Sequence, residues 1–265
     1  MTRAVNAAAR VGHHFGLRVD EPLLLQETNN VVVWLRPSPV VAKVGRWPHS
    51  EERLRREHAV AAALAREGGP VVPPIGTPAI DGQTGFVVTL WERVEHDTAH
   101  APAPEELAAS LRELHAALAS YDGDTPSFRS AIALAREALH EVDTSVRTTL
   151  ETAFEQLLPE LDAHNHAEQH LHGEPHDSNL LRTAAGLRWI DLEGVCRGPL
   201  EWDLAFLPEE AAALFPKSHT DLLRLLRLLN SARVATWCWL RVDVGDTRWH
   251  AEHHLAVVRA ALGAV

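Results

Sequence analysis

Two polar segments near residue 180 most constrain the fold of this 265-residue chain, because a short hairpin would bring them together. The first, HGEPHDSN, covers residues 172–179, and the second, WIDLE, covers residues 189–193. The sequence between them reads as a β-hairpin with Ala185-Gly186 in its turn, so we expect Asn179 and Asp191 to lie close in space. Amide and carboxylate oxygens are ligands that magnesium accepts. The hairpin therefore predicts a magnesium site.

The first ninety or so residues predict a small β-sheet with one helix packed on it. Two valine-rich runs, residues 31–35 and 40–44, flank Arg-Pro-Ser-Pro, which indicates a hairpin. Residues 50–67 predict a helix, because a serine can cap its start, two glutamates follow and two glycines end it. A further strand is predicted over residues 86–91.

The composition changes near residues 95–104, where two prolines and small polar residues interrupt the pattern. We take this segment as the boundary between two predicted domains, residues 1–95 and residues 96–265. Beyond it, apolar spacing is mainly helical, although Pro159 is expected to end or kink the third helix. The predicted helices cover residues 105–120, 128–142, 146–163, 221–240 and 248–262.

A second pair of residues points to an ion pair in the predicted β-sheet region. Lys43 lies in the second valine-rich run, and Glu57 follows fourteen residues later on the predicted helix. Leu54, Ala61 and Leu64 share the helix face of Glu57. A carboxylate on an apolar stripe needs a partner, and Lys43 is the obvious one.

Taken in order, these segments resemble the aminoglycoside phosphotransferase and choline kinase family. That family's signature reads His-Gly-Asp, then Asn, an Ile-Asp strand and a later Asp-Leu-Ala; this chain has HGEPHDSN, WIDLEG and, at residues 202–205, WDLA. The resemblance spans residues 25–205. It implies an α+β, protein-kinase-like two-lobe fold, with a small β-sheet N-lobe carrying one packed helix and a larger, mainly helical C-lobe. It also implies an ATP-dependent phosphotransferase that acts on a hydroxyl of a small molecule.

By this resemblance, Asn179 and Asp191 would bind the magnesium ions that bridge the phosphates of ATP, or of GTP. His172 and Asp203 would support the catalytic loop. Glu174 stands where the family has its catalytic Asp, which accepts or orients the proton of the acceptor hydroxyl. The extra methylene shifts this oxygen, and an error near an ångström can cost on the order of a hundredfold in rate. The pocket either compensates for this shift or turnover is weak.

The resemblance also supplies the rest of the nucleotide site. Glu57 would orient Lys43 toward the phosphates. The loop over the nucleotide would map to residues 27–30 and include Asn30. Backbone groups of the interlobe hinge would hold the base. The hinge residues assigned to the cofactor are Leu90, Trp91, Glu92 and Val94.

The acceptor is less constrained, and the helical region after Leu207 should set its identity. Acidic residues in that region would complement the charge of a cationic acceptor such as an aminoglycoside, a peptide antibiotic or an amino sugar. A solvated acidic surface explains the same residues equally well. Those acidic residues are Glu209, Glu210, Asp221, Asp243, Asp246 and Glu252.

Tryptophans could offer surfaces to a sugar ring, but such residues are more often core. The candidate acceptor contacts are His176, Asp177, Glu193, Trp202 and Glu209. Antibiotic resistance, self-protection and metabolism all stay open as roles.

Composition narrows the classes of partner. With 25 basic and 36 acidic residues, the net charge of −11 argues against nucleic acid and anionic membranes as partners. No signal sequence or membrane span is evident, and the two cysteines lack metal or disulfide spacing, so we expect a cytoplasmic protein with reduced thiols.

Two other interpretations remain. A nucleotide-binding pseudokinase with a regulatory role is supported by Glu174 alone. A metallohydrolase would use His170, His172 and His176 with Asp177, but the HxHxDH spacing of one such class is absent.

Overall fold

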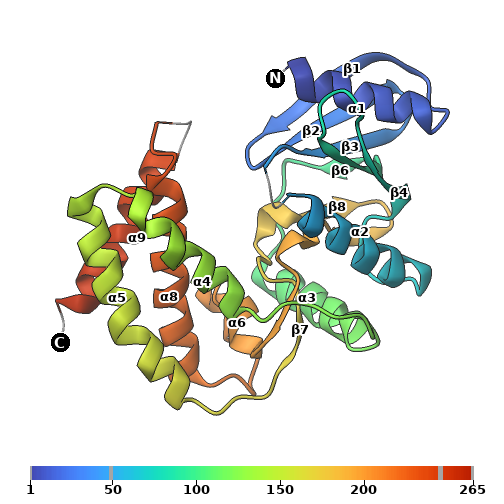
Figure 1. Ribbon diagram of the computed structural model, residues 1–265. Helices are drawn as coiled ribbons and strands as arrows, with labels where there is room; N and C mark the ends of the chain where they lie inside the picture. The colour runs from blue at the N-terminus through green and yellow to red at the C-terminus, as the bar shows by residue number, and fades with distance from the viewer. Residues whose placement is uncertain (1, 48–49, 244–246, 264–265) are drawn as a thin grey trace. The chain divides into compact units, whose positions relative to one another are not determined.

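The computed structural model describes residues 2–47, 50–243 and 247–263, and packing divides the chain into two compact units (Figure 1). The first unit contains the residues up to Thr125 together with His172–Val195, and the second contains Pro126–Leu171 and the residues from Cys196 onward. Both polar segments around the predicted hairpin thus belong to the first unit, with the N-terminal sheet. The lobe division expected after residue 95 stays a prediction.

An antiparallel five-stranded sheet forms the N-terminal part of the first unit, in the order β1-β2-β3-β5-β4. The strands expected from the valine-rich runs and from residues 86–91 are present, but β1 and β4 were not predicted. Both are edge strands that contain proline, and β4 also contains glycine, so neither shows the apolar alternation of a buried strand. The strands are β1 (Val19–Glu27), β2 (Asn30–Pro37), β3 (Val40–Gly45), β4 (Pro74–Ile80) and β5 (Val87–Glu92).

Each face of this sheet packs against a helix. Helix α1 (Thr2–His14) covers the face that carries Val33 and Ala42, and α2 (Ser50–Arg66) contributes Glu57 to the face that carries Lys43. The sequence predicted α2 and missed α1. The buried residues of α1 are mainly alanines, whose small side chains give a weak apolar signal. Within the described residues, two helices rather than the predicted one thus pack on this sheet.

The rest of the first unit contains α3 (Pro104–Leu118) and a three-stranded sheet in the order β6-β8-β9. Its strands are β6 (His96–Asp97), β8 (Leu180–Thr183) and β9 (Gly186–Trp189). The predicted hairpin is confirmed, since Leu180 pairs with Trp189. Its turn is one residue earlier than expected, because Thr183 pairs with Gly186 and leaves two alanines between them. Gly186 follows the turn at a φ of 101°, a conformation that favours glycine.

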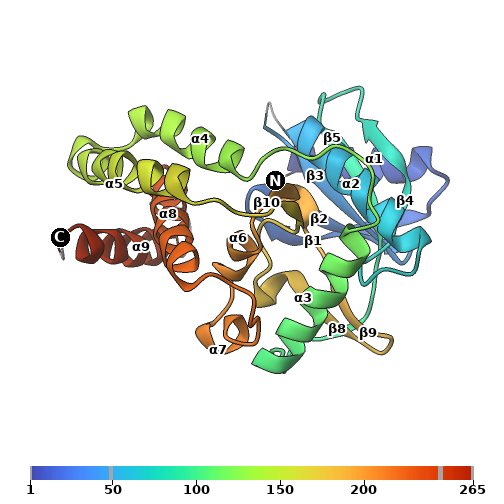
Figure 2. The same ribbon diagram turned by 90° about the horizontal axis from the view of Figure 1, so that it is seen from below.

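The second unit is mainly helical, as expected. Figure 2 shows α4, α5, α8 and α9 side by side, and their buried apolar residues form one core. Helix α5 continues to Ala163, so Pro159 does not end it. The elements are α4 (Arg129–Ala138), α5 (Thr144–Ala163), β7 (Gln169–Leu171), β10 (Cys196–Gly198), α6 (Leu200–Leu204), α7 (Glu209–Ala212), α8 (Thr220–Trp239) and α9 (Thr247–Leu262). Among the described residues, no helix combines the length and the apolar character needed to cross a bilayer.

Candidate active site

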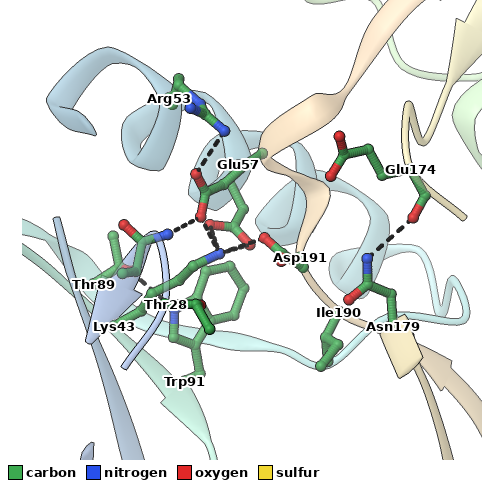
Figure 3. Close-up of polar contacts among 12 residues, drawn as sticks. Thr28, Lys43, Arg53, Glu57, Thr89, Trp91, Glu174, Asn179, Ile190 and Asp191 are labelled. Atoms are coloured by element: carbon green, nitrogen blue, oxygen red, sulfur yellow. Dashed lines mark hydrogen bonds and ion pairs between the residues drawn. The ribbon is translucent and has the colours of Figure 1, made fainter. Parts of the chain in front are cut away.

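Lys43 is the centre of a dense group of charges in the first unit (Figure 3). Its Nζ donates to both carboxylate oxygens of Glu57 at 3.0 Å, which confirms the predicted ion pair. It also donates to Oδ1 of Asp191 at 2.6 Å. Lys43 and Glu57 are buried, whereas the Asp191 side chain is 43% exposed. The ammonium therefore joins β3 and α2 to the turn that follows β9.

A third carboxylate completes this group. Oε1 of Glu193 lies 2.5 Å from Nζ of Lys43 and accepts a hydrogen bond from Nδ2 of Asn30. Its other oxygen, Oε2, lies 3.2 Å from a guanidinium nitrogen of Arg53 on α2. We call these six residues the Lys43 cluster: Asn30, Lys43, Arg53, Glu57, Asp191 and Glu193.

The crowding of carboxylates changes their proton affinities. Burial, assisted by the neighbouring charges of Glu193 and Asp191, raises the pKa of Glu57 to about 8 despite the adjacent ammonium. Burial acts in the same direction on Asp191, but the charge of Lys43 outweighs it and lowers that pKa to about 2. Burial disfavours the charged form of Lys43, yet the three carboxylates raise its pKa well above the ordinary value. The three carboxylates thus favour the charged form of Lys43.

The hairpin positions Asp191 next to Asn179. The backbone N–H of Ile190 donates to the carbonyl of Asn179 at 2.9 Å, which extends the β8–β9 pairing by one step. Asp191 follows directly and has φ 61° and ψ 50° in the left-handed region. Aspartate and asparagine tolerate this conformation better than most residues, and such strained positions concentrate at functional sites.

His172 and Gly173 hold the loop of residues 172–179 against the turn that contains Asp191. The Nε2 of His172 lies 3.1 Å from the carbonyl of Ile190, and its Nδ1 lies 3.3 Å from the N–H of Glu174. These contacts fit a neutral ring that donates through Nε2 and accepts at Nδ1. Gly173 has a φ of 92°, and a Cβ there would stand 1.9 Å from the carbonyl oxygen of Gly194. Only glycine permits this close approach.

Asn179 is anchored through its amide nitrogen. Its Nδ2 donates to the Glu174 carbonyl at 3.0 Å and lies 3.2 Å from Nε2 of His176. Because the nitrogen faces the loop, the amide oxygen is oriented for a different partner, such as a cation. In Figure 3 the Glu174 carbonyl faces Asn179, while its carboxylate points away from that side chain.

With this geometry established, comparison with known proteins identifies the family. The model of the phosphotransferase enzyme family matches residues 23–227, about three quarters of the chain. The chain belongs to this family. It is therefore a small-molecule phosphotransferase. No curated protein sequence matches the chain significantly.

Solved structures of similar fold are kinases of several small molecules. A choline/ethanolamine kinase family protein from Mesorhizobium loti is 18% identical, covers 98% of this chain and 93% of its own, and gives a TM-score of 0.66. An amicoumacin kinase in complex with AMP-PNP and Ca2+ is 13% identical, with coverages of 98% and 96% and a TM-score of 0.72. The GDP complex of aminoglycoside 2'-phosphotransferase-IIIa is 14% identical, with coverages of 97% and 99% and a TM-score of 0.70. These likenesses confirm the protein-kinase-like fold.

The predicted hinge of this phosphotransferase lies at the end of β5. Leu90 is buried in the core under α1, so only its backbone could contact a nucleotide, whereas Trp91 is half-buried. The N–H of Glu92 donates to the Pro73 carbonyl at 3.0 Å and is already paired. Val94 follows β5 and has a half-buried side chain. The assignment of these residues to the base stays a prediction.

The residues predicted to contact the acceptor belong to different elements of the structure. His176 and Asp177 belong to the loop of residues 172–179, where Asp177 is exposed. Glu193 is buried in the Lys43 cluster, which sequence reasoning did not foresee. Trp202 is 1% exposed and packs on Phe128, so its indole belongs to the core of the second unit rather than to an acceptor surface.

Two further predicted residues lie in the second unit. Asp203 in α6 is fully buried, and its expected support of the catalytic loop stays a prediction. Glu209 begins α7, pairs with Arg227 at 3.3 Å and lines a cavity of about 530 Å³. Asp246, one of the acidic residues considered for a cationic acceptor, lies outside the described residues.

The first unit contains a group of carboxylates with the donor chemistry of a hard divalent cation site, and the Lys43 ammonium contacts each of them. Among residues 2–47, 50–243 and 247–263, one group of three or more candidate ligands was found, Glu57, Asp191 and Glu193, with ligand atoms within 4.8 Å of one another. Carboxylate oxygens of this kind suit magnesium or calcium. A histidine-based metal centre is not supported in this part of the chain, because both ring nitrogens of His172 contact the backbone.

Proposed function

We propose that this phosphotransferase transfers the γ-phosphoryl group of ATP to a hydroxyl of a small, cationic molecule, with magnesium as the metal. The observation that carries the proposal is the convergence of Lys43, Glu57 and Asp191 at distances of 2.6–3.0 Å, with Asn179 one hairpin step from Asp191. In phosphoryl transfer the protein contributes positioning and charge, and this constellation supplies both.

Each side chain has a role that follows from its chemistry. Lys43, oriented by Glu57, would bind the nucleotide phosphates. Asn179 and Asp191 would hold the divalent ion. When bound, the ion neutralises the charge that develops on the phosphoryl oxygens.

Glu174 would accept or orient the proton of the acceptor hydroxyl. Glutamate and aspartate have similar intrinsic proton affinity, so the chemistry is available to either residue. The Glu174 backbone is held at both ends, by the ring of His172 and by the amide of Asn179. Such anchoring of the loop reduces the positional freedom that the longer side chain introduces.

The nucleotide and acceptor assignments draw on the relatives. The amicoumacin kinase structure contains AMP-PNP and Ca2+, and the aminoglycoside 2'-phosphotransferase-IIIa structure contains GDP. We propose ATP as the donor, with GTP as the alternative, and Val94 as the hinge contact because the N–H of Glu92 is occupied. An aminoglycoside, a peptide antibiotic or an amino sugar is the proposed acceptor. The net charge of −11 favours a cation, and resistance to an antibiotic is the corresponding role.

A transfer assay tests this function directly. The protein would be incubated with magnesium, ATP or GTP, and candidate aminoglycosides, cyclic peptide antibiotics, amino sugars and choline-like amines, and phosphorylated products detected by mass spectrometry. We expect one class of acceptor to be phosphorylated. Nucleotide binding without transfer to any class would instead support the pseudokinase interpretation.

The base is tested with substitutions at position 174. Glu174→Ala should bind the nucleotide normally and lose transfer, because the base faces the acceptor rather than the nucleotide. Glu174→Asp, the residue typical of the family, should retain transfer, and Glu105→Ala at an exposed position of α3 is the matched control. Transfer by Glu174→Ala at the parental rate would exclude Glu174 as the base.

A further inference from the structure

Glu193 connects three elements of the first unit through a single carboxylate. Its Oε1 contacts Lys43 on β3 and Asn30 at the start of β2, whereas its Oε2 contacts Arg53 on α2. The carboxylate is buried, with 8% of the side chain exposed. A buried carboxylate is stable only when its oxygens are paired, and here separate partners pair each oxygen.

Arg53 differs from the next two arginines of its own helix. Arg55 and Arg56 pair with glutamates four residues earlier on α2, at 2.8 and 3.2 Å, so those contacts stay within the helix. Arg53 instead reaches the turn after Asp191. It lies one helical turn before Glu57, and its side chain is 48% exposed. Arg53 therefore connects the start of α2 to Glu193, in the turn that follows Asp191.

Loss of the contact with Arg53 would remove the partner of Oε2 in the Glu193 carboxylate. The terminal torsion of a glutamate is broad, so its orientation depends on what holds the two oxygens. A carboxylate that turns away from Arg53 also moves Oε1, which Lys43 and Asn30 share. The guanidinium fork fixes such an orientation better than an ammonium does, because its donors lie in one plane.

We propose that Arg53 is a positioning residue of the nucleotide site, which acts through Glu193 on Lys43 and Asn30. The inference rests on the proposed function, because it takes those two residues as groups that contact the nucleotide. Arg53 orients Glu193, Glu193 orients the ammonium of Lys43 and the amide of Asn30, and the site is thereby preorganised before the nucleotide arrives. Neither the sequence pattern nor the family signature singles out Arg53.

Calorimetric titration with AMP-PNP and magnesium measures this effect apart from catalysis. Arg53→Gln should raise the dissociation constant of the nucleotide about threefold to tenfold, the scale of one partly exposed charge-assisted hydrogen bond. Arg53→Lys should restore part of the loss. Arg55→Gln is the matched control, since Arg55 has a similar exposure of 45% on the same helix, and it should bind like the parent.

A double-mutant cycle separates positioning from direct contact. Glu193→Gln should weaken binding by itself, and adding Arg53→Gln should then cause no further loss. If Arg53→Gln weakens binding equally with and without Glu193, the arginine acts on the phosphates by its own charge and the inference is overturned. An unchanged dissociation constant for Arg53→Gln also overturns it.

Two controls distinguish failure of the proposed function from failure of the inference about Arg53. Thermal unfolding without nucleotide should be nearly the same for the parent, Arg53→Gln and Arg55→Gln, and Arg53→Lys replaces Arg53→Gln in the cycle if the latter unfolds early. If the parent itself binds no nucleotide, the proposed function fails and this inference fails with it. If the parent binds and the Arg53 variants bind equally well, only the inference about Arg53 fails.

Discussion

The two units bury polar side chains in different ways. In the first unit, the Lys43 cluster brings three carboxylates to one ammonium, with Arg53 at the margin. In the second unit, α8 buries Asn230, Ser231 and Arg233, and we call these residues together with His254 of α9 the α8 polar group. There the Arg233 guanidinium donates to Oδ1 of Asn230 at 3.0–3.1 Å, and His254 lies 3.3 Å from the Ser231 hydroxyl.

The two regions differ in the charge of the side chains that they bring together, and this difference helps to recognise a candidate functional site. The α8 polar group joins mostly uncharged partners, and burial keeps the imidazole of His254 neutral by lowering its pKa to about 4. Such groups satisfy one another and can serve packing alone. Three neighbouring carboxylates repel one another and cost stability unless a cation intervenes. Perturbed proton affinity of this kind concentrates at active sites.

Substitution in the core of the second unit should produce the largest change, and it should appear in stability. Trp202 is 1% exposed and packs against Phe128 and Phe206 with ring centroids 5.3 and 5.9 Å away. We expect Trp202→Ala to lower the free energy of unfolding by about 3–5 kcal/mol, since a large cavity remains. Chemical denaturation measures this value. A change below about 1 kcal/mol would show that the indole is not a core element.

Substitution in the Lys43 cluster should instead appear in activity. Asp191→Asn removes the carboxylate that we propose as the main metal ligand and should lower kcat about a hundredfold or more, equivalent to roughly 2.7 kcal/mol of transition-state stabilisation. The fold should persist, because asparagine also tolerates the left-handed backbone at this position. Steady-state kinetics tests the first part and thermal unfolding the second. Asp20→Asn on β1 is the control, and near-normal turnover of Asp191→Asn would refute the metal assignment.

The last expected effect is a pH dependence of stability, with opposite signs in the two regions. Burial raises the pKa of Glu57 from 4.5 to about 8, so the folded state binds more protons than the unfolded chain in this range. The contribution of Glu57 to stability is therefore complete below about pH 4.5 and is lost as the pH rises through 8. The difference in unfolding free energy between the parent and Glu57→Gln should fall across that window.

His254 provides the comparison for this measurement. Burial, with smaller effects of His253, His250 and Arg233, lowers its pKa from 6.5 to about 4, so the folded state binds fewer protons in between. Its contribution is complete above pH 6.5 and is lost as the pH falls toward 4. The difference between the parent and His254→Gln should thus rise with pH. Equal slopes for the two variants in urea denaturation between pH 5 and 7 would contradict this contrast.

The sequence was sufficient for the parts of the site that local patterns encode. The spacing between Asn179 and Asp191 contains one short hairpin, and strand pairing alone then sets their proximity. The pair formed by Lys43 and Glu57 followed from a charge on an apolar helix face, which required a partner. In both cases a local sequence pattern was sufficient to predict the contact.

Other parts depend on tertiary contacts that no local pattern reports. Glu193 was considered for the acceptor, yet the turn directs it toward Lys43 and Arg53. Arg53 is one of several arginines on α2, and only the fold distinguishes it from Arg55. Helix α1 was missed because its buried face consists mainly of alanine, and β1 and β4 because edge strands with proline lack alternation.

A crystal structure with AMP-PNP and manganese in place of magnesium tests the central claim most directly. The account predicts an anomalous manganese peak whose ligands include the amide oxygen of Asn179 and a carboxylate oxygen of Asp191, at about 2.0–2.3 Å, with the phosphates completing the coordination. A manganese ion bound to the nucleotide but contacting neither side chain would contradict it.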